Sequence, residues 1–290
     1  MSILAQRAAP TLAISATEYQ KFCEFFYRRT GISFGENKRY FVDKRLIERI
    51  QKTNARDFET YFERLRRYDA SVEIEALINL LTINETYFYR EDHQLDCLVK
   101  GILPELAAEH RKGGRIRIWS MPCSTGEEPY SIAMYLLENW KQVDDYDIEI
   151  MASDIDTNVL RAAEEGVYDA RSLHRLSPEL IRKYFVSIGG NKGYRLIDPV
   201  RESVRFTKVN ASSLAEMRAF SQIDVIFCRN MLIYFDDQSR RQVVESFYDG
   251  LSQGGFICLG HSESMSRISS LFEIRKFPQA IVYQKRGGAR

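Results

Sequence analysis

The chain has 290 residues, 44% of them hydrophobic and 28% charged, which is typical of a globular protein with one large or two modest domains. Its formal net charge is +1, so no overall field favours nucleic acid or a membrane surface as partner. The five cysteines form no C-x-x-C pair and the four histidines have no metal-ligand spacing, which argues against a disulfide framework and a metal site. No stretch approaches the roughly 20 apolar residues of a membrane span, so we expect no membrane insertion and a reduced, cytoplasmic setting.

Residues 1–81 predict helices only. Ser15 and Glu18 have the spacing of a capping box, and Gly31 stands where a helix would end in a left-handed residue. Further helices are expected over 38–52 and 57–68, and Ser71 is a candidate cap for a fourth. The short connections indicate a small helical domain.

The segment 82–91 has neither a helical nor a strand period. Linkers are usually rich in Gly, Ser or Pro, whereas this one carries aromatic and hydrogen-bonding side chains. We therefore expect it to pack against another part of the chain.

Residues 92–290 alternate between strand and helix patterns, which predicts βαβ units and a mostly parallel sheet. The predicted helices are 92–109, 129–140, 157–165 and 237–251, and the predicted strands are 116–120, 148–153, 224–228 and 255–259. At the end of the chain, 272–277 and 280–284 predict an antiparallel hairpin. Residues 186–209, which include the glycine-rich run Gly189 to Gly193, predict a small antiparallel β-insertion.

The turn after the first strand is a candidate ligand site, because open parallel sheets bind ligands at the carboxyl ends of their strands. Gly126 would let a ligand approach the backbone closely. Glu127 and Glu128 stand before the next helix, where a phosphate would otherwise bind, so they suit a cation such as an ammonium or a sulfonium. The alternative at this point is an ordinary strand-turn-helix with acidic residues in its first turn.

Two further strand ends carry polar groups. Asp154 is the better candidate for holding ribose hydroxyls, whereas Asp156 precedes a helix and is the better capping candidate. The third strand runs into Arg229 and Asn230, and it lacks the Asn/Asp-Pro-Pro-Tyr pattern of amine-methylating enzymes. An oxygen acceptor is therefore favoured over an amine.

Taken together, these motifs resemble the chemotaxis receptor glutamate O-methyltransferase family (CheR) over nearly the full chain. The matching stretches are Asn84 to Arg90, Ser124 to Ala133, Ala152 to Asp156, Val209 with Asn210, Ile226 to Asn230 with Ile233 to Asp236, and Gly260 to Glu263. The resemblance implies an α/β fold: a Rossmann-like class I methyltransferase sheet over 92–290 with an antiparallel C-terminal hairpin, an inserted β-subdomain at about 186–209 and an N-terminal helical domain over 1–81. The linker 82–91 would contribute to the cofactor site.

The resemblance also implies S-adenosyl-L-methionine as cofactor, with S-adenosyl-L-homocysteine as product. The implied cofactor-binding residues are Asn84, Thr86, Arg90, Glu128, Asp154, Asn210, Ala211, Arg229 and Asn230. Arg90 and Tyr234 would lie closest to the transferred methyl group; read without the resemblance, Tyr234 is more simply a buried aromatic beside Phe235. No metal is implied.

The implied partners are the cytoplasmic helices of methyl-accepting chemoreceptors. Between Lys38 and Arg67 the basic residues outnumber the acidic ones by about five, and Lys38, Arg45, Arg49 and Lys52 fall near one helical face. This basic face is either a solvated surface or a docking site for a glutamate-rich receptor helix. The β-insertion has a shorter glycine-rich loop than family members that bind a receptor tail there, so the resemblance does not assign that binding to this chain.

Three other functions are possible alternatives to a glutamate methyltransferase. A dinucleotide oxidoreductase would need G-x-G-x-x-G after the first strand, where only Gly126 is present. A methyltransferase acting on RNA or a small molecule is disfavoured for RNA by the near-neutral charge. An adaptor that binds the cofactor without transfer is disfavoured by the presence of Arg90, Glu128, Asp154 and Tyr234.

Overall fold

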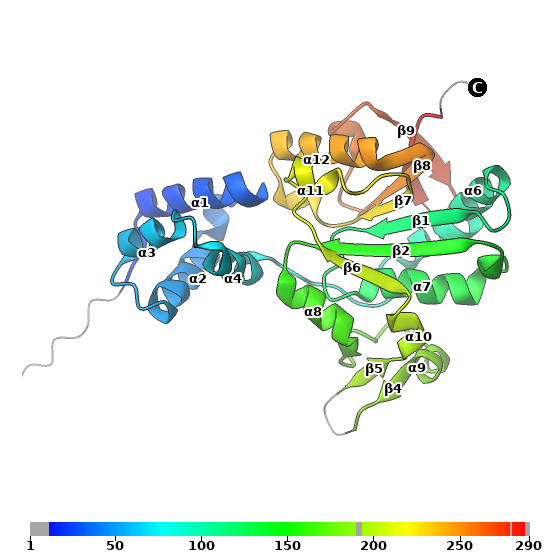
Figure 1. Ribbon diagram of the computed structural model, residues 1–290, viewed down its shortest axis with the longest axis horizontal. Helices are drawn as coiled ribbons and strands as arrows, with labels where there is room; N and C mark the ends of the chain where they lie inside the picture. Colours follow the sequence, from blue (N-terminus) through cyan, green and yellow to red (C-terminus); the bar gives the residue numbers. More distant parts are fainter. Residues whose placement is uncertain (1–11, 190–192, 279, 288–290) are drawn as a thin grey trace, which may run out of the picture. The chain divides into compact units, whose positions relative to one another are not determined.

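The computed structural model describes residues 12–189, 193–278 and 280–287, and the chain divides into two compact units, Met1–Leu81 and Thr82–Arg290 (Figure 1). The division falls where the sequence changes from helical patterns to the aromatic linker. Each unit has its own hydrophobic core, and each is described separately here.

The N-terminal unit is helical, as predicted. The Ser15 hydroxyl accepts a hydrogen bond from the Glu18 backbone N–H, and the Glu18 carboxylate accepts one from the Ser15 N–H at 2.7 Å, so the capping box is present. Gly31 ends the first helix with a φ of 71°. Ser71 is the first residue of its helix rather than a side-chain cap. The helices are α1 (Ala16–Thr30), η1 (Glu36–Lys38), α2 (Arg39–Lys52), α3 (Phe58–Leu65) and α4 (Ser71–Leu81).

Two arginines of the expected basic face, Arg45 and Arg49, make contacts within this unit instead. Arg49 pairs with Glu73, which also accepts a hydrogen bond from the Tyr61 hydroxyl at 2.6 Å, and the Arg49 side chain is only 12% exposed. The Arg45 Nε donates to the Leu80 carbonyl oxygen at 2.7 Å. The prediction of one continuous basic face was therefore wrong at these two positions, because the helical period does not reveal which cations pair with a neighbouring helix.

The second unit is built on a seven-stranded sheet in the order β6-β2-β1-β7-β8-β10-β9. The first five strands in this order run parallel, and β10 is antiparallel to both β8 and β9, which confirms the predicted mostly parallel sheet with a C-terminal hairpin. The strands are β1 (Arg115–Ser120), β2 (Asp147–Asp154), β6 (Val204–Lys208), β7 (Ile223–Cys228), β8 (Leu251–Leu259), β9 (Phe272–Phe277) and β10 (Ala280–Lys285).

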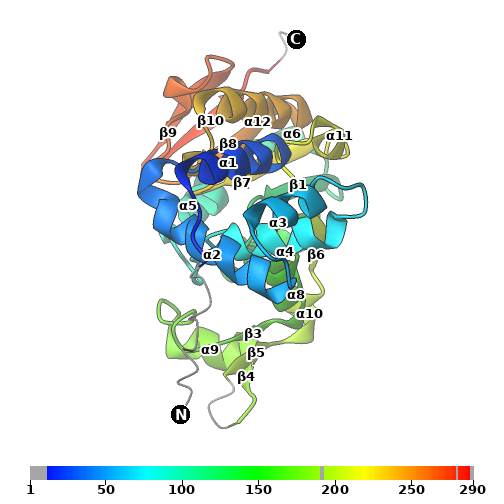
Figure 2. The ribbon, with the colours of Figure 1, turned by 90° about the vertical axis from the view of Figure 1, so that its left-hand side faces the viewer.

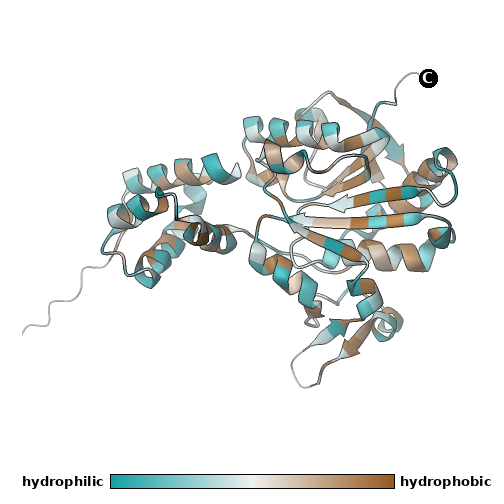
Figure 3. Ribbon diagram, in the orientation of Figure 1, coloured by the Kyte–Doolittle hydropathy of each residue, from teal (hydrophilic) through white to brown (hydrophobic). Residues whose placement is uncertain are grey.

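Helices cover both faces of this sheet, so its central strands are apolar on both sides (Figures 1 and 3). In β7, Val225 and Phe227 face the core under α7 (Glu127–Asn139), while Ile226 and Cys228 face the core under α12 (Asp237–Gly250). The helical segments are α5 (Asp92–Cys97), the π-helical η2 (Leu98–Ile102), α6 (Leu103–Glu109), α7 (Glu127–Asn139), η3 (Val143–Asp145), α8 (Thr157–Glu165), α9 (Pro178–Tyr184), α10 (Asp198–Arg201), α11 (Leu214–Met217), η5 (Leu232–Tyr234), α12 (Asp237–Gly250) and η6 (Met265–Arg267). The single helix predicted over 92–109 is thus continuous but contains one π-helical stretch.

The inserted β-subdomain differs from its predicted bounds. A separate three-stranded antiparallel sheet forms from β3 (Val167–Tyr168), β5 (Tyr194–Leu196) and β4 (Phe185–Ser187), and it lies beyond α10 from the large sheet (Figure 2). The segment 203–208, expected inside the insertion, instead forms β6 and pairs in parallel with β2 at the edge of the large sheet. An edge strand alternates between buried and exposed residues as a hairpin strand does, so the sequence pattern could not separate the two. Gly190, Asn191 and Lys192 of the predicted glycine-rich loop lie outside the described residues.

Among the residues that the structure describes, no helix combines the length and the apolar character that crossing a membrane requires.

Candidate active site

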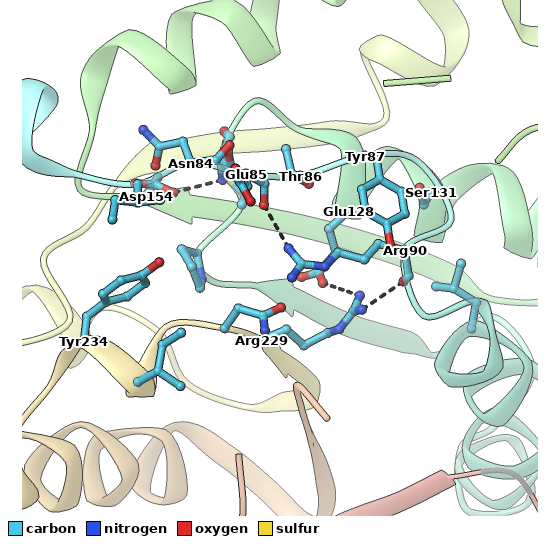
Figure 4. Close-up of a pocket in the computed structure, with 17 residues that line it drawn as sticks. Asn84, Glu85, Thr86, Tyr87, Arg90, Glu128, Ser131, Asp154, Arg229 and Tyr234 are labelled. Atoms are coloured by element: carbon cyan, nitrogen blue, oxygen red, sulfur yellow. Dashed lines mark hydrogen bonds and ion pairs between the residues drawn. The ribbon is translucent and has the colours of Figure 1, made fainter. Parts of the chain in front are cut away.

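A cavity of about 260 Å³ opens at the carboxyl ends of β1, β2 and β7 (Figure 4). This is where an open parallel sheet binds its ligands. The cavity is lined by residues of the linker, of the turn after β1, of the end of β2 and of the loop after β7. Figure 4 shows the linker residues Asn84, Glu85, Thr86 and Tyr87 on one side and Arg229 and Tyr234 on the other.

The linker is held as one wall of this cavity, which confirms that it packs against the rest of the chain. The Phe88 ring is buried edge-on against the rings of Tyr168 and Phe185, with centroids 4.8 and 5.2 Å away. The Tyr89 N–H donates to the Ser131 hydroxyl at 3.0 Å. With these two residues anchored inward, residues 83–87 and Arg90 line the cavity, among them the predicted Asn84 and Thr86.

Arg90 is anchored at one end of its guanidinium. Its Nη1 donates to the Glu85 carbonyl oxygen at 2.8 Å, and the guanidinium carbon lies 5.9 Å from the centre of the Tyr87 ring. The remaining donors of a guanidinium with one such contact are available to a ligand that carries oxygen.

Glu128 reaches the cavity from the first turn of α7. One carboxylate oxygen accepts from the Ser120 hydroxyl at 2.8 Å, and the other pairs with the Arg229 Nη1 at 2.8 Å. Burial raises the pKa of Glu128 although Arg229 opposes this shift. Glu127 does not line the cavity; it is buried and accepts hydrogen bonds from the Thr125 and Ser172 hydroxyls.

The structure gives a packing reason for glycine at position 126. Its φ of 92° and its neighbours require glycine, because a Cβ there would lie 2.9 Å from the Ala163 Cβ and 3.0 Å from the Tyr130 ring. These neighbours are protein side chains, so Gly126 is required by the packing of the turn, whatever its role toward a ligand.

Asp154 ends β2 with its carboxylate buried in the cavity wall. Its oxygens accept from the backbone N–H groups of Ser124 and Asp156 at 2.9 and 3.0 Å. Burial raises the pKa of Asp154 to about 6. Asp156 is a helix cap as predicted, since it accepts from the N–H groups of Asn158 and Val159. It also accepts from the Asn84 amide at 2.8 Å, which ties the linker to the end of β2.

Arg229 is a deeply buried charge of the site, with a side chain only 4% exposed. Its guanidinium pairs with Glu128 and, at 3.2 Å, with Glu91, and it donates to the Arg90 carbonyl oxygen at 2.9 Å. Its Nε has no hydrogen-bond partner among the described residues. A buried donor without a partner is costly, and a polar ligand in the cavity that Arg229 lines would offer one.

The loop after β7 carries Asn230 and Tyr234, both of which line the cavity. Asn230 has a positive φ of 58°. The partly buried Glu263 carboxylate fixes this loop by accepting from the N–H groups of Asn230, Leu232 and Gly260 at 2.8, 2.8 and 3.0 Å. Tyr234 is half-buried rather than a core aromatic, and burial raises the pKa of its hydroxyl.

Two of the predicted cofactor-binding residues do not line the cavity. Asn210 and Ala211 follow β6 and do not line the cavity, although the preceding Val209 donates its N–H to the Asp154 carbonyl oxygen at 2.9 Å. The Asn210 side chain accepts from the Ser212 N–H at 3.0 Å. Within the described ranges, no group of three or more His, Cys, Asp or Glu side chains is arranged to hold a metal ion.

Two acidic residues of the site received no role from the sequence. Glu91 pairs with Arg229, and Glu263 holds the loop after β7. Both stand at the ends of segments already noticed, Asn84 to Arg90 and Gly260 to Glu263. A carboxylate inside such a segment was the available signal, but its partner lies far away in the chain.

Comparisons with known proteins agree with this geometry. The sequence model described as "CheR methyltransferase, SAM binding domain" matches residues 84–281, and the one described as "CheR methyltransferase, all-alpha domain" matches residues 17–82. The chain is 52% identical to chemotaxis protein methyltransferase 2 of Vibrio cholerae, over 94% of either chain. It is 35% identical to the chemotaxis protein methyltransferase of Salmonella typhimurium, over 91% of this chain and 89% of that one. A solved structure of the DszA carbon methyltransferase aligns with 85% of this chain and 67% of its own at a TM-score of 0.43 and 14% identity.

Proposed function

Because this chain belongs to the CheR methyltransferase family, we propose that it is a protein-glutamate O-methyltransferase, which transfers a methyl group from S-adenosyl-L-methionine to glutamate side chains of chemoreceptors in bacterial chemotaxis. The products are glutamate methyl esters and S-adenosyl-L-homocysteine. The reaction takes place at the cytoplasmic side of the membrane, where chemoreceptor methylation helices lie.

One observation carries the proposal. The residues that the family resemblance assigns to the site come from segments far apart in the chain, and all of them except Asn210 and Ala211 line a single cavity. A chance resemblance of short motifs would have no reason to converge in this way.

The donor set of the cavity fits the cofactor. A carboxylate at the end of β2, such as Asp154, accepts hydrogen bonds from ribose hydroxyls. Glu128 offers negative charge to a cationic group, and Arg229 has a buried Nε that lacks a partner among the described residues. We assign the rest of the cofactor contacts to Asn84, Thr86, Arg90 and Asn230, with Asn210 and Ala211 at the adjoining end of β6.

The chemistry needs little from the protein beyond alignment. When bound, the cofactor supplies a methyl group on a positively charged sulfur. The acceptor carboxylate has a pKa of about 4.3 and is ionised at neutral pH, so no general base is required. Because opposite charges disappear along the reaction, exclusion of water by the linker wall favours transfer.

Arg90 and Tyr234 are the proposed catalytic residues. Arg90 is held at the Glu85 carbonyl oxygen and directs its free donors to the acceptor carboxylate, which orients one oxygen for attack. Tyr234 brings its hydroxyl to the cavity from the opposite side (Figure 4). Its raised pKa keeps the hydroxyl protonated, and therefore a donor, near the acceptor oxygen.

The test is transfer of labelled methyl groups by the full-length chain to membranes that contain chemoreceptors. We expect label that is released by base, as an ester requires, and transfer lowered at least roughly a hundredfold in Arg90→Ala, the size expected for one positioning contact in the transition state. Transfer by Arg90→Ala at the wild-type rate would show that its assigned role is wrong. Label on RNA or on a small molecule instead of the receptor, or cofactor binding without any transfer, would refute the proposed function.

We further propose that chemoreceptor helices dock on the basic surface of residues 38–67. Arg45 and Arg49 are occupied within the N-terminal unit, so the surface consists of the exposed cations Lys38, Lys44, Lys52, Arg56, Arg64, Arg66 and Arg67. A glutamate-rich helix complements this charge, and such attraction acts mainly on the association rate.

A charge-reversal experiment tests the docking surface. The triple variant Lys38→Glu, Lys44→Glu and Lys52→Glu should raise the KM for receptor roughly tenfold and leave S-adenosyl-L-homocysteine affinity unchanged. A matched control reverses three exposed cations of the second unit, namely Lys141, Arg161 and Lys276. Equal KM values for the two triple variants would contradict docking at this surface.

A further inference from the structure

The rim of the active-site cavity is apolar at two places. Three of the described residues that line the cavity are exposed to solvent, namely Ile83, Glu85 and Ile233. Ile83 is 38% exposed and Ile233 is 48% exposed. Single exposed apolar residues are common on protein surfaces, but exposed apolar residues that gather at the mouth of a binding cavity are typical of contact with a partner.

The linker backbone is fixed on both sides of Ile83. The Thr82 hydroxyl and the Asn84 amide both donate to the Asp156 carboxylate, at 2.6 and 2.8 Å. Asp156 also accepts hydrogen bonds from the first turn of α8, so its own position is fixed. Ile83 is therefore exposed on a part of the linker that the end of β2 holds in place.

The loop that carries Ile233 is also held on both sides. Leu232 is buried and donates its N–H to the Glu263 carboxylate at 2.8 Å. The Arg240 guanidinium donates to the Leu232 and Phe235 carbonyl oxygens at 3.0 and 2.8 Å. Ile233 is thus exposed on a loop whose neighbouring residues are buried and hydrogen-bonded.

The proposed catalytic residues lie deeper than this rim. Arg90 and Tyr234 line the same cavity but are only partly exposed, and Arg90 donates to the carbonyl oxygen of Glu85, the third rim residue, at 2.8 Å. A substrate carboxylate that reaches Arg90 and Tyr234 must therefore bring the atoms around it to the rim.

The geometry of a helix determines which substrate atoms these are. On an α-helix, the side chains three and four residues from a given position lie on the same face, with Cβ atoms about 5–6 Å apart. A helix that inserts one glutamate into the cavity therefore brings these neighbouring side chains to the rim. Contact with isoleucine is favourable for apolar side chains and unfavourable for charged ones, which would lose water there.

We propose that Ile83 and Ile233 are specificity-determining residues, which contact apolar side chains one helical turn away from the accepting glutamate of the receptor helix. The inference rests on the proposed function, since it names how the same site selects among the glutamates of its substrate. A glutamate with charged neighbours at these positions is consequently methylated more slowly, although the cofactor binds equally well.

The test combines steady-state methyl transfer to chemoreceptor-containing membranes with calorimetry on the full-length chain. Ile83→Ser and Ile233→Ser should each raise the KM for receptor about fivefold, the scale expected for burying part of one isoleucine side chain. The dissociation constant of S-adenosyl-L-homocysteine should change by less than about twofold. Ile83→Val and Ile233→Val keep a branched apolar side chain, so their KM for receptor should stay within about twofold of the wild type.

Ile274→Ser and Ile281→Ser are the matched controls. Ile274 on β9 is 52% exposed and Ile281 on β10 is 56% exposed, but neither lines the cavity. Both controls lose the same exposed side chain as the rim variants, and their KM for receptor should equal that of the wild type.

A change in the receptor tests the same contact from the substrate side. Aspartate in place of an apolar residue three or four positions from an accepting glutamate should slow methylation of that glutamate about fivefold with the wild-type enzyme. The double variant Ile83→Ser, Ile233→Ser should distinguish the two receptors by less than about twofold, because residues in contact are energetically coupled.

Three results decide the matter. Equal KM values for receptor in the rim variants and the controls would overturn the inference. A loss of S-adenosyl-L-homocysteine affinity as large as the rise in KM would also refute it, because the two isoleucines would then contact the cofactor rather than the receptor. A wild-type chain that transfers no methyl group to receptors would instead contradict the proposed function.

Discussion

Glu263 offers the sharpest test of how the fold supports the site. Its partly buried carboxylate accepts hydrogen bonds from three backbone N–H groups, those of Asn230, Leu232 and Gly260, at distances of 2.8 to 3.0 Å. In Glu263→Gln, one oxygen can still accept two of these bonds, but the amide NH₂ faces the Leu232 N–H. A buried donor left without an acceptor costs about 1–3 kcal/mol.

This cost translates into a measurable shift in thermal unfolding. For a domain of 150–250 residues, 1 kcal/mol lowers Tm by about 2–4 °C, so we expect Glu263→Gln to unfold roughly 2–12 °C below the wild type. Glu263→Ala leaves all three donors without the carboxylate and should lose about 3–5 kcal/mol. Both variants should also lose methyl transfer at temperatures where they are fully folded, because Asn230 and Tyr234 lie on the loosened loop.

Glu273→Gln is the control, since Glu273 is half exposed on β9 and pairs with Arg286 at the surface. Such a pair contributes less than about 1 kcal/mol. Scanning calorimetry and a methyl-transfer assay on the same samples make the comparison. If Glu263→Gln and Glu273→Gln had the same Tm, the assigned role of the three hydrogen bonds would be refuted.

Three further predictions follow from the site. Gly126→Ala should lower the free energy of unfolding by about 1–2 kcal/mol because of its positive φ, and by about 1–3 kcal/mol more because the new Cβ crowds Ala163. Gly113 also has a positive φ but open space around it, so Gly113→Ala should show only the first loss. Urea unfolding measures both variants. Tyr234→Phe should lower kcat about tenfold with S-adenosyl-L-homocysteine affinity unchanged, measured by steady-state kinetics and calorimetry; an unchanged kcat would remove the hydroxyl from the mechanism. Burial raises the pKa of Asp154 to about 6, so the folded state holds this proton more tightly than the unfolded state. The free energy of unfolding of the wild type, relative to that of Asp154→Asn, should therefore fall by at most ~3 kcal/mol as pH rises from about 4 to about 6. A stability difference that does not change with pH in urea unfolding would show that Asp154 titrates normally.

The elements that depend on local interactions could be predicted from the sequence. The capping box of Ser15 and Glu18, the left-handed Gly31 and the Asp156 cap depend on residues three or four positions apart, and all three are present. The alternation of strands and helices fixed the parallel sheet, and with it the edge at which a ligand binds. The site residues came from motifs that the family resemblance joined, because no local pattern relates Asn84 to Arg229.

The tertiary structure decided which residues meet across the chain. β6 pairs in parallel with β2 at the edge of the large sheet, although its sequence pattern fits a hairpin strand equally well. Arg45 and Arg49 are engaged within the N-terminal unit, because Arg45 donates to the Leu80 carbonyl oxygen of α4 and Arg49 pairs with Glu73.

The same holds at the cavity. Gly126 lies close to Ala163 and Tyr130, and Glu91 pairs with Arg229 only because the two distant segments meet in the fold. Helix caps and periodicity act over a few residues and can be read from a short window, whereas packing and buried ion pairs depend on where distant segments meet in space.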